Sequence, residues 1–331
     1  MAPSVDPAIL KALGLDAEKT KMSSHGGSGF ASTFKLWGTV SGDEKIYFVK
    51  TGSGKDAETM FRGAKCFCSP TREHASLNAI HSAVPDFCPA SYAYGTMSSE
   101  GRFFMATDFL DLGGRGASGT GKSLAAKLAQ LHTTPAPVPK GFDKPMFGFP
   151  VPTCCGSTVQ DNSWKESWAE FYADNRLRHI LAAGIRTNGK DAELERTVEA
   201  VASRVVPRLL GDGHLKGVKP VVVHGDLWSG NHGAGKFAGR DGGVEEVVYD
   251  PSCVYGHSEF ELGIMKMFGG FGSDFWQEYG KLVPKSEPAE EFEDRVALYE
   301  LYHHLNHFAI FGGGYRGGAM SIMKKLISKY G

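Results

Sequence analysis

The chain has 331 residues, of which 41% are hydrophobic and 22% are charged, and its formal net charge at pH 7 is −1. This composition is that of an average globular protein, and the length corresponds to one large domain or two lobes. The near-zero charge gives no sign of a nucleic-acid or membrane surface, and no segment approaches the ~18 apolar residues of a membrane-spanning helix. The N-terminal residues also lack the apolar run of a secretory signal. We therefore expect a cytoplasmic monomer without a nucleic-acid or membrane partner.

Apolar periodicity predicts a β-rich first part, residues 1–110, with few helices. Helices are expected over residues 5–15 and 71–82. A glycine turn within residues 23–29 is expected to lead into a strand that ends at Trp37. Further strands are expected over residues 46–50, 90–95 and 101–110.

The second part, residues 111–331, has a mainly helical pattern. After a glycine-rich connection, helices are expected over 123–132, 163–183 and 191–210, and most of 257–331 also has a helical pattern. Short strands are expected at 221–226 and 244–250, and a proline-rich loop at 133–152. The sequence therefore predicts an α+β fold with a small β-rich N-lobe and a larger helical C-lobe.

Six cysteines lie at positions 66, 68, 88, 154, 155 and 253. The spacings typical of zinc sites, paired C-x-x-C or a matching H-x-x-x-H, are absent. We therefore interpret the cysteines as free thiols in a reducing compartment.

The segment HGDLWSGN, residues 224–231, has the H-x-D-x-x-x-x-N spacing of a kinase catalytic loop. In that arrangement the aspartate, here Asp226, accepts the proton of the attacking hydroxyl. The amide, here Asn231, binds Mg²⁺, and a carboxylate after the next strand, here Asp250, binds Mg²⁺ together with the ATP phosphates. The pattern predicts these three roles.

Kinase chemistry also requires phosphate-binding groups upstream. A glycine-rich turn lets backbone N–H groups approach phosphate oxygens without obstruction by Cβ. The predicted turn contains Gly26, Gly27, Ser28 and Gly29, and Lys50 at the end of the following strand is the candidate phosphate ligand. Glu73 in the next helix is its expected partner, with Glu58 as the alternative.

These motifs together resemble the fructosamine-3-kinase or ketosamine-3-kinase (protein-ribulosamine 3-kinase) family, in a fungal-type member. The resemblance covers nearly the whole chain. It includes HGDLWSGN, the Asp250-Pro251 pair, YGHSE (255–259), FGGFG (268–272), FGF (147–149) and LYHHLNH (301–307). The resemblance implies a protein-kinase-like, aminoglycoside-phosphotransferase-like fold. It also implies ATP-dependent phosphorylation, with Mg²⁺, of the sugar O3 of ketosamines on lysine amines, which removes the sugar from proteins.

The resemblance and chain position suggest further site residues. Trp228, two residues after the base, is a candidate to stack on the sugar, and Asn306 and His307 are expected near the acceptor. Backbone groups near Asp108 and Leu110 are expected to bind the adenine of ATP.

Four alternatives remain open. Residues 116–123, GASGTGKS, match the P-loop pattern G-x-x-x-x-G-K-[ST], although a P-loop also needs a βαβ context. The segment GHSEF (256–260) resembles a hydrolase nucleophile elbow, but Phe260 would crowd that turn. The chain is also compatible with an inactive kinase-like binding protein, or with a phosphotransferase for aminoglycosides or choline.

Overall fold

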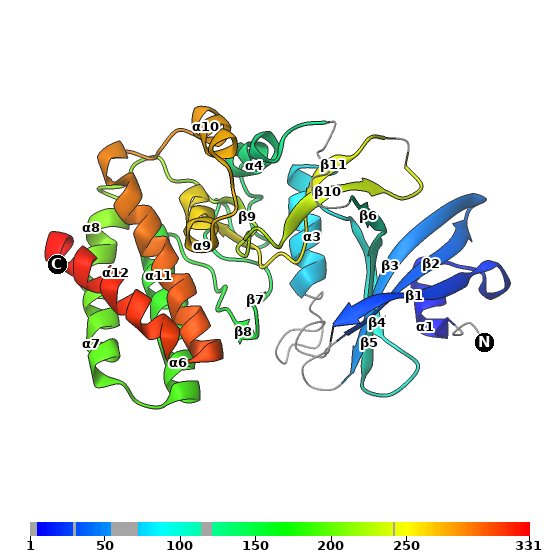
Figure 1. Cartoon of the computed structure of the whole chain (residues 1–331), viewed down its shortest axis with the longest axis horizontal. Coiled ribbons are helices and arrows are strands. Elements are labelled where there is room, and N and C mark those ends of the chain that lie inside the picture. The colour runs from blue at the N-terminus through cyan, green and yellow to red at the C-terminus, as the bar shows by residue number, and fades with distance from the viewer. Residues whose placement is uncertain (1–4, 29–30, 54–71, 114–120, 241) are drawn as a thin grey trace. The chain divides into compact units, whose positions relative to one another are not determined.

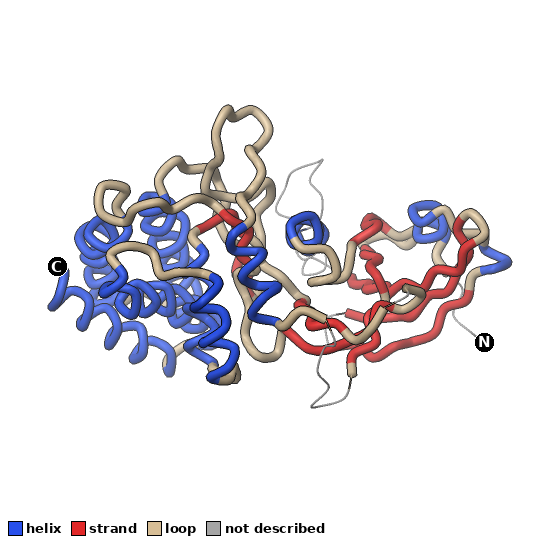
Figure 2. Tube along the Cα trace, turned by 90° about the horizontal axis from the view of Figure 1, so that it is seen from above, coloured by secondary structure: helices blue, strands red, loops and turns tan. Residues whose placement is uncertain are grey.

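The computed structural model describes residues 5–28, 31–53, 72–113, 121–240 and 242–331. Gly29, Glu58, the Cys66 and Cys68 pair and residues 116–120 of the P-loop-like motif lie outside these residues. Contacts divide the chain into two compact units: unit 1 comprises Met1–Leu124 and His232–Asp250, and unit 2 comprises Ala125–Asn231 and Pro251–Gly331. Figure 2 shows the strands concentrated in unit 1 and most of the helices in unit 2.

Unit 1 is built on a five-stranded antiparallel sheet (Figure 1). Its strands are β1 (Lys21–Ser28), β2 (Ala31–Val40), β3 (Asp43–Ser53), β4 (Ser91–Thr96) and β5 (Arg102–Asp108), in the spatial order β1-β2-β3-β5-β4. Among the described residues, the α-helices α1 (Pro7–Leu13) and α3 (Arg72–Ala83) accompany them. Alternation along the strands buries one face of the sheet, where Leu36, Val49 and Ala106 have no exposed surface.

Unit 1 also contains a second sheet of three strands, β6 (Leu110–Leu112), β10 (His232–Phe237) and β11 (Glu245–Val248). Strand β10 pairs with β11 on one side and with β6 on the other. The hairpin of β10 and β11, from late in the chain, therefore completes the sheet whose first strand, β6, comes just after β5. The sequence predicted β11 but neither β6 nor β10. Strand β6 has only three residues, and β10 contains Gly233 and Gly235, residues that are depleted in strands.

The glycine turn expected within residues 23–29 differs from the structure. Strand β1 extends through most of it and ends at Ser28, which is paired with Ala31. The pairing register shifts between Ser24 and Gly27, and Gly26 has φ +78°. A glycine at this irregularity lets the strand bend while it stays paired, so residues 23–28 of the expected turn form a strand with a bulge, and Gly29 lies outside the described residues.

Unit 2 is mainly helical, as the sequence predicted. Its helices are α4 (Leu124–Thr133), α5 (Trp168–Phe171), α6 (His179–Asn188), α7 (Ala192–Ala200), α8 (Val206–Leu210), α9 (Glu261–Phe268), α10 (Ser273–Leu282), α11 (Phe292–Phe311) and α12 (Gly314–Tyr330), α4 being counted from its second residue. The π-helical turns Tyr172–Arg178 and Val201–Val205 join α5 to α6 and α7 to α8. The two long helices expected at 163–183 and 191–210 are therefore confirmed, each with a π-helical section, but the first begins at Trp168, after its N-cap Ser167, and ends at Asn188.

Two small antiparallel sheets complete unit 2: β9 (Val221–Val223) with β12 (Val254–Gly256), and β7 (Cys154–Cys155) with β8 (Thr158–Val159). The core beside them is rich in aromatic rings. Trp168 stacks on Phe171 at a centroid distance of 5.4 Å and donates a hydrogen bond from Nε1 to the Tyr299 hydroxyl. This packing anchors α5 to α11, the central helix of the unit.

The fold excludes the P-loop interpretation. All strand pairs among the described residues are antiparallel, whereas a P-loop requires a parallel βαβ unit. In the described part of the chain, none of the helices is long and apolar enough to cross a membrane.

Candidate active site

Lys50 lies on the central strand β3 and forms a cluster with two carboxylates of unit 1. Because Val49 is buried in the core, the alternation of the strand turns Lys50 to the opposite face of the sheet. Its Nζ lies 3.1 Å from Glu73 Oε2 on α3 and 3.6 Å from Asp250 Oδ1. The two carboxylates, Glu73 first, raise the pKa of Lys50 despite its burial. The predicted pairing of Glu73 with Lys50 is thus confirmed, whereas the alternative Glu58 lies outside the described residues.

Asp250 has an unusual backbone conformation. It follows β11 by two residues and has φ +53°, a left-handed value that few residues other than glycine adopt. Its side chain is 61% exposed, although one oxygen faces Lys50. Backbone strain of this kind is concentrated at functional sites, and here it leaves a carboxylate accessible to a ligand.

The predicted catalytic loop follows β9 in unit 2 and is closed by its own hydrogen bonds. Trp228 N donates to Asp226 O (3.1 Å), Asn231 N donates to Trp228 O (2.9 Å) and Asn231 Nδ2 donates to Asp226 O (2.9 Å). The Asn231 amide also lies 3.5 Å from Asp226 Oδ2. The loop therefore holds the side chains of the two predicted functional residues next to each other.

The start of this loop is supported by a buried carboxylate that the sequence analysis missed. Glu261, on α9, accepts hydrogen bonds from the backbone N–H groups of His224 (2.6 Å) and Gly225 (3.0 Å), and His132 Nε2 lies 3.5 Å away. Burial opposes its ionisation, but the adjacent His132 ring and the backbone hydrogen bond from His224 bring the pKa of Glu261 below its ordinary value. Gly225 has φ +80°, and a Cβ there would collide with the carbonyl oxygen of Ser252.

A second group that the sequence analysis missed is Cys155, which we interpreted as an ordinary thiol. Its buried Sγ lies 3.8 Å from Asp226 Oδ1 and 3.2 Å from the Nδ2 of Asn306 on α11. Burial, together with the Asp226 carboxylate, raises the pKa of the Cys155 thiol well above its ordinary value. The protonated thiol can therefore donate a weak hydrogen bond to Asp226. Through this cysteine, the predicted residue Asn306 is linked to Asp226, the candidate base.

The remaining acceptor residues lie in unit 2 as well. Trp228 is 40% exposed, and its indole packs against Gly230, where a Cβ would collide with the ring. His307, on α11, donates from Nδ1 to the carbonyl oxygen of His303 (2.7 Å), and burial lowers its pKa. Both rings are thus held in place and remain uncharged at neutral pH.

The groups expected to bind adenine are engaged within unit 1. The Asp108 carboxylate accepts hydrogen bonds from Ala90 N (2.9 Å), Tyr92 Oη (2.6 Å) and Arg240 Nη2 (2.5 Å). Its backbone N–H donates to Ala90 O, and Leu110 is paired with Phe237 in the second sheet. The Asp108 side chain therefore stabilises the sheets, and adenine recognition at this segment stays a prediction.

The structure brings the predicted residues together in two groups. Unit 1 holds Gly26, Gly27, Ser28, Lys50, Glu73, Asp108, Leu110 and Asp250, and unit 2 holds Asp226, Trp228, Asn231, Asn306 and His307. Among the described residues, no group of three or more His, Cys, Asp or Glu side chains is arranged to hold a metal ion. Mg²⁺ commonly uses only one or two protein ligands together with substrate phosphates and water, so a cluster of three is not required for the predicted ligands Asn231 in unit 2 and Asp250 in unit 1.

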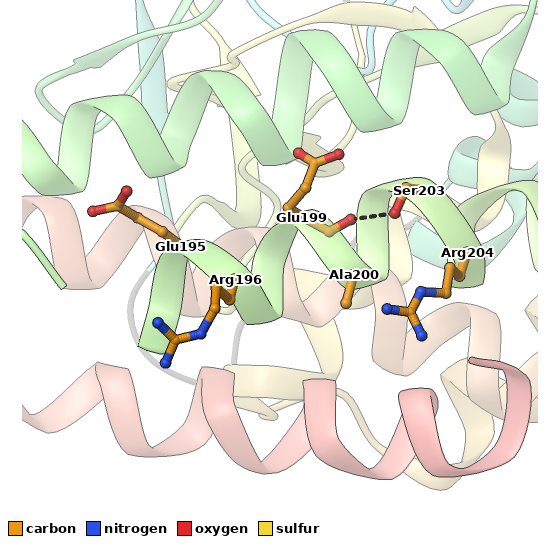
Figure 3. A pocket seen from close by; sticks show the side chains of 6 residues that line it. All are labelled: Glu195, Arg196, Glu199, Ala200, Ser203 and Arg204. Carbon is orange, nitrogen blue, oxygen red and sulfur yellow. Dashed lines mark hydrogen bonds between the residues drawn. The ribbon is translucent and has the colours of Figure 1, made fainter. Parts of the chain in front are cut away.

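A surface hollow on α7 of unit 2 has no part in this arrangement. It is lined by Glu195, Arg196, Glu199, Ala200, Ser203 and Arg204 (Figure 3). Its residues come from one helical segment, and Ser203 Oγ donates to the Glu199 carbonyl of the same segment at 2.7 Å. None of the predicted site residues lines it.

Known proteins resemble this chain in both sequence and fold. The family model described as fructosamine kinase matches residues 1–329. The ketosamine-3-kinase of Mus musculus is 33% identical over 333 residues, covering 94% of this chain and 97% of the mouse protein. The chloroplastic protein-ribulosamine 3-kinase of Oryza sativa subsp. japonica is 35% identical over 283 residues, covering 85% and 72%. A crystal structure of a putative fructosamine-3-kinase from Haemophilus somnus 129PT shares the fold, with a TM-score of 0.70, 20% identity and coverage of 98% and 96%.

Proposed function

The chain belongs to the fructosamine kinase family and is an ATP-dependent kinase, and from this premise we propose that it phosphorylates the sugar O3 of ketosamines on lysine amines. Phosphorylated ketosamines are unstable and release the sugar, so the activity would repair glycated proteins. The observation that carries the proposal is the catalytic loop, where Asp226 and Asn231 lie side by side at the family's signature motif.

The residues present fit ATP and Mg²⁺. The cluster of Lys50, Glu73 and Asp250 places a cation that is permanently charged at neutral pH beside an exposed carboxylate. Asn231 uses its Nδ2 to bond the Asp226 carbonyl, so its Oδ1 is oriented away from that contact and can act as a ligand. Asn231 and Asp250 would hold Mg²⁺, which when bound neutralises charge on the β- and γ-phosphates.

In the proposed phosphoryl transfer, Lys50, Glu73 and Asp226 have separate roles. The Lys50 ammonium, oriented by Glu73, offsets the negative charge of the α- and β-phosphates. The Asp226 carboxylate orients the O3 hydroxyl of the ketosamine and accepts its proton as the oxygen attacks the γ-phosphorus. The bond between the γ-phosphorus and the β–γ bridging oxygen breaks, and ADP leaves. Cys155 and Glu261 act on this step only through the position of Asp226.

Two measurements test the proposal. The first is ATP consumption with ribulosyl-lysine, fructosyl-lysine, an aminoglycoside and choline as separate acceptors, and we expect turnover with the ketosamines. Turnover of another acceptor together with inactivity on both ketosamines would refute the proposed substrate class.

The second measurement uses Asp226→Asn. We expect this variant to lose ~10²–10⁴ in kcat, because the general base is removed, while ATP binding measured by calorimetry is retained. Near-normal turnover by the variant would show that Asp226 is not the base.

A further inference from the structure

Unit 2 carries a row of partly exposed aromatic rings that starts at the catalytic loop. We call this row the aromatic strip: it consists of Trp228, Phe268, His307, Phe311 and Tyr315. Successive ring centroids are 6.2 Å apart from Trp228 to Phe268, 5.2 Å from Phe268 to His307 and 5.8 Å from His307 to Phe311. Trp228 is 40%, Phe268 42% and Phe311 69% exposed.

The strip is formed by separate elements that converge on one surface. Phe268 ends α9, His307 and Phe311 lie on the last turn of α11, and Tyr315 lies in the first turn of α12. Tyr315 contacts both His307 (5.0 Å between centroids) and Phe311 (6.1 Å). Large exposed apolar residues that are contiguous, rather than scattered singly, indicate a binding surface.

The start of the strip adjoins the candidate base. Trp228 lies two residues after Asp226 in the same loop, and its backbone N–H donates to the carbonyl oxygen of Asp226. We therefore expect a sugar whose O3 reaches Asp226 to have its remaining substituents near Trp228. A ketosamine carries an amine on C1, and this amine bears the lysine side chain and the polypeptide. Beyond the sugar, the substrate must therefore continue away from the base.

We propose that the aromatic strip binds the part of the substrate beyond the sugar, and that the enzyme prefers ketosamines on lysines with apolar neighbours in the sequence. This inference rests on the proposed function. The rings attract the protonated secondary amine through cation–π interactions and cover the lysine methylene groups. The lysine side chain would extend along the start of the strip, and since an extended chain advances only ~3.4 Å per residue, the residues next to the modified lysine would lie within reach of Phe311 and Tyr315.

The test compares two ribulosyl-lysine peptides that differ only in the residues on both sides of the modified lysine, phenylalanine in one and serine in the other. For the wild type we expect kcat/KM to be about fivefold higher for the phenylalanine peptide, the size of one aromatic contact. The ratio should fall to about one in Phe311→Ser and in Tyr315→Ser. Phe142→Ser is the matched control, because Phe142 is 40% exposed in the same unit and lies outside the strip, and it should keep the wild-type ratio.

The possible results distinguish a failure of the proposed function from a failure of the inference about the aromatic strip. Turnover of neither peptide would refute the proposed function, and with it this inference. Equal turnover of both peptides by the wild type, or a preference that survives in both strip variants, would refute the inference alone. A wild-type dimer in sedimentation that Phe311→Ser dissociates would assign the strip to a second copy of the chain and would also overturn it. Thermal unfolding of the variants verifies that they are folded.

Discussion

The buried carboxylate of Glu261 provides the sharpest quantitative prediction, because it receives two backbone hydrogen bonds at the start of the catalytic loop. The change is Glu261→Gln, which preserves shape and removes the charge. Glutamine has one acceptor oxygen, so it can bond His224 N or Gly225 N, but its amide group then faces the other N–H. One backbone donor is left unsatisfied in a site where the side chain is almost fully buried.

The magnitude follows from these two bonds. A hydrogen bond to a charged group contributes ~1.5–3 kcal/mol, a neutral one ~1 kcal/mol, and a buried donor without a partner costs ~1–3 kcal/mol. The variant should therefore lose about 3 kcal/mol of unfolding free energy. At ~2–4 °C per kcal/mol for a unit of this size, the unfolding midpoint should fall by ~6–12 °C in calorimetry.

The pH dependence gives an independent check with a defined sign. Because the pKa of folded Glu261 lies below its ordinary value of 4.5, its contribution is fully present above pH 4.5 and is lost as the pH falls through the folded pKa. The difference in stability between wild type and variant should thus shrink below pH 4.5. Glu290→Gln, at an exposed position of unit 2, serves as control and should change stability by less than ~0.5 kcal/mol. An unfolding midpoint of Glu261→Gln within 2 °C of the wild type would refute the reasoning.

Three further predictions concern the site groups. Lys50→Met should lower kcat/KM for ATP by ~10²–10³ in steady-state kinetics, because a positioned charge is lost. In the same assay Lys122→Ala, at the exposed end of the P-loop-like motif, should retain nearly full activity. Asp250→Asn should raise the Mg²⁺ concentration needed for half-maximal activity at least tenfold in a metal titration, and an unchanged titration would contradict its role as ligand. Cys155→Ala should lower kcat about fivefold at constant KM, consistent with a lost hydrogen bond of ~1 kcal/mol, and Cys155→Ser should recover most of it. Equal losses in both cysteine variants would indicate a packing role instead.

The fold class and the core of the candidate site could be predicted because their signals are local. The spacing between Asp226 and Asn231 fits one loop, and that loop closes through bonds between those same residues. Glu73 could be proposed as the partner of Lys50 because both lie in elements with clear periodicity.

Other features depend on contacts between distant residues, which leave no local pattern. The pairing of β10 with β6 joins residues more than 100 positions apart, and β10 itself is glycine-rich. Cys155 lies 71 positions before Asp226, so no spacing rule connects the thiol to the candidate base. Glu261 is one glutamate in a helical segment, and only the structure shows that its carboxylate faces backbone N–H groups.

The division of the chain into units has a consequence for how the protein can be produced in pieces. Unit 1 is discontinuous: its second segment, His232–Asp250, begins directly after Asn231 and ends at Asp250. An expressed fragment ending at Leu124 would lack the hairpin, so β6 would present unpaired backbone groups and Lys50 would retain one of its two carboxylate neighbours. The complementary fragment would carry the hairpin without the strand that it pairs with. Because the chain passes repeatedly between the units, no single cut separates one complete unit from the other. Both candidate metal ligands, Asn231 and Asp250, lie at points where the chain passes from one unit to the other.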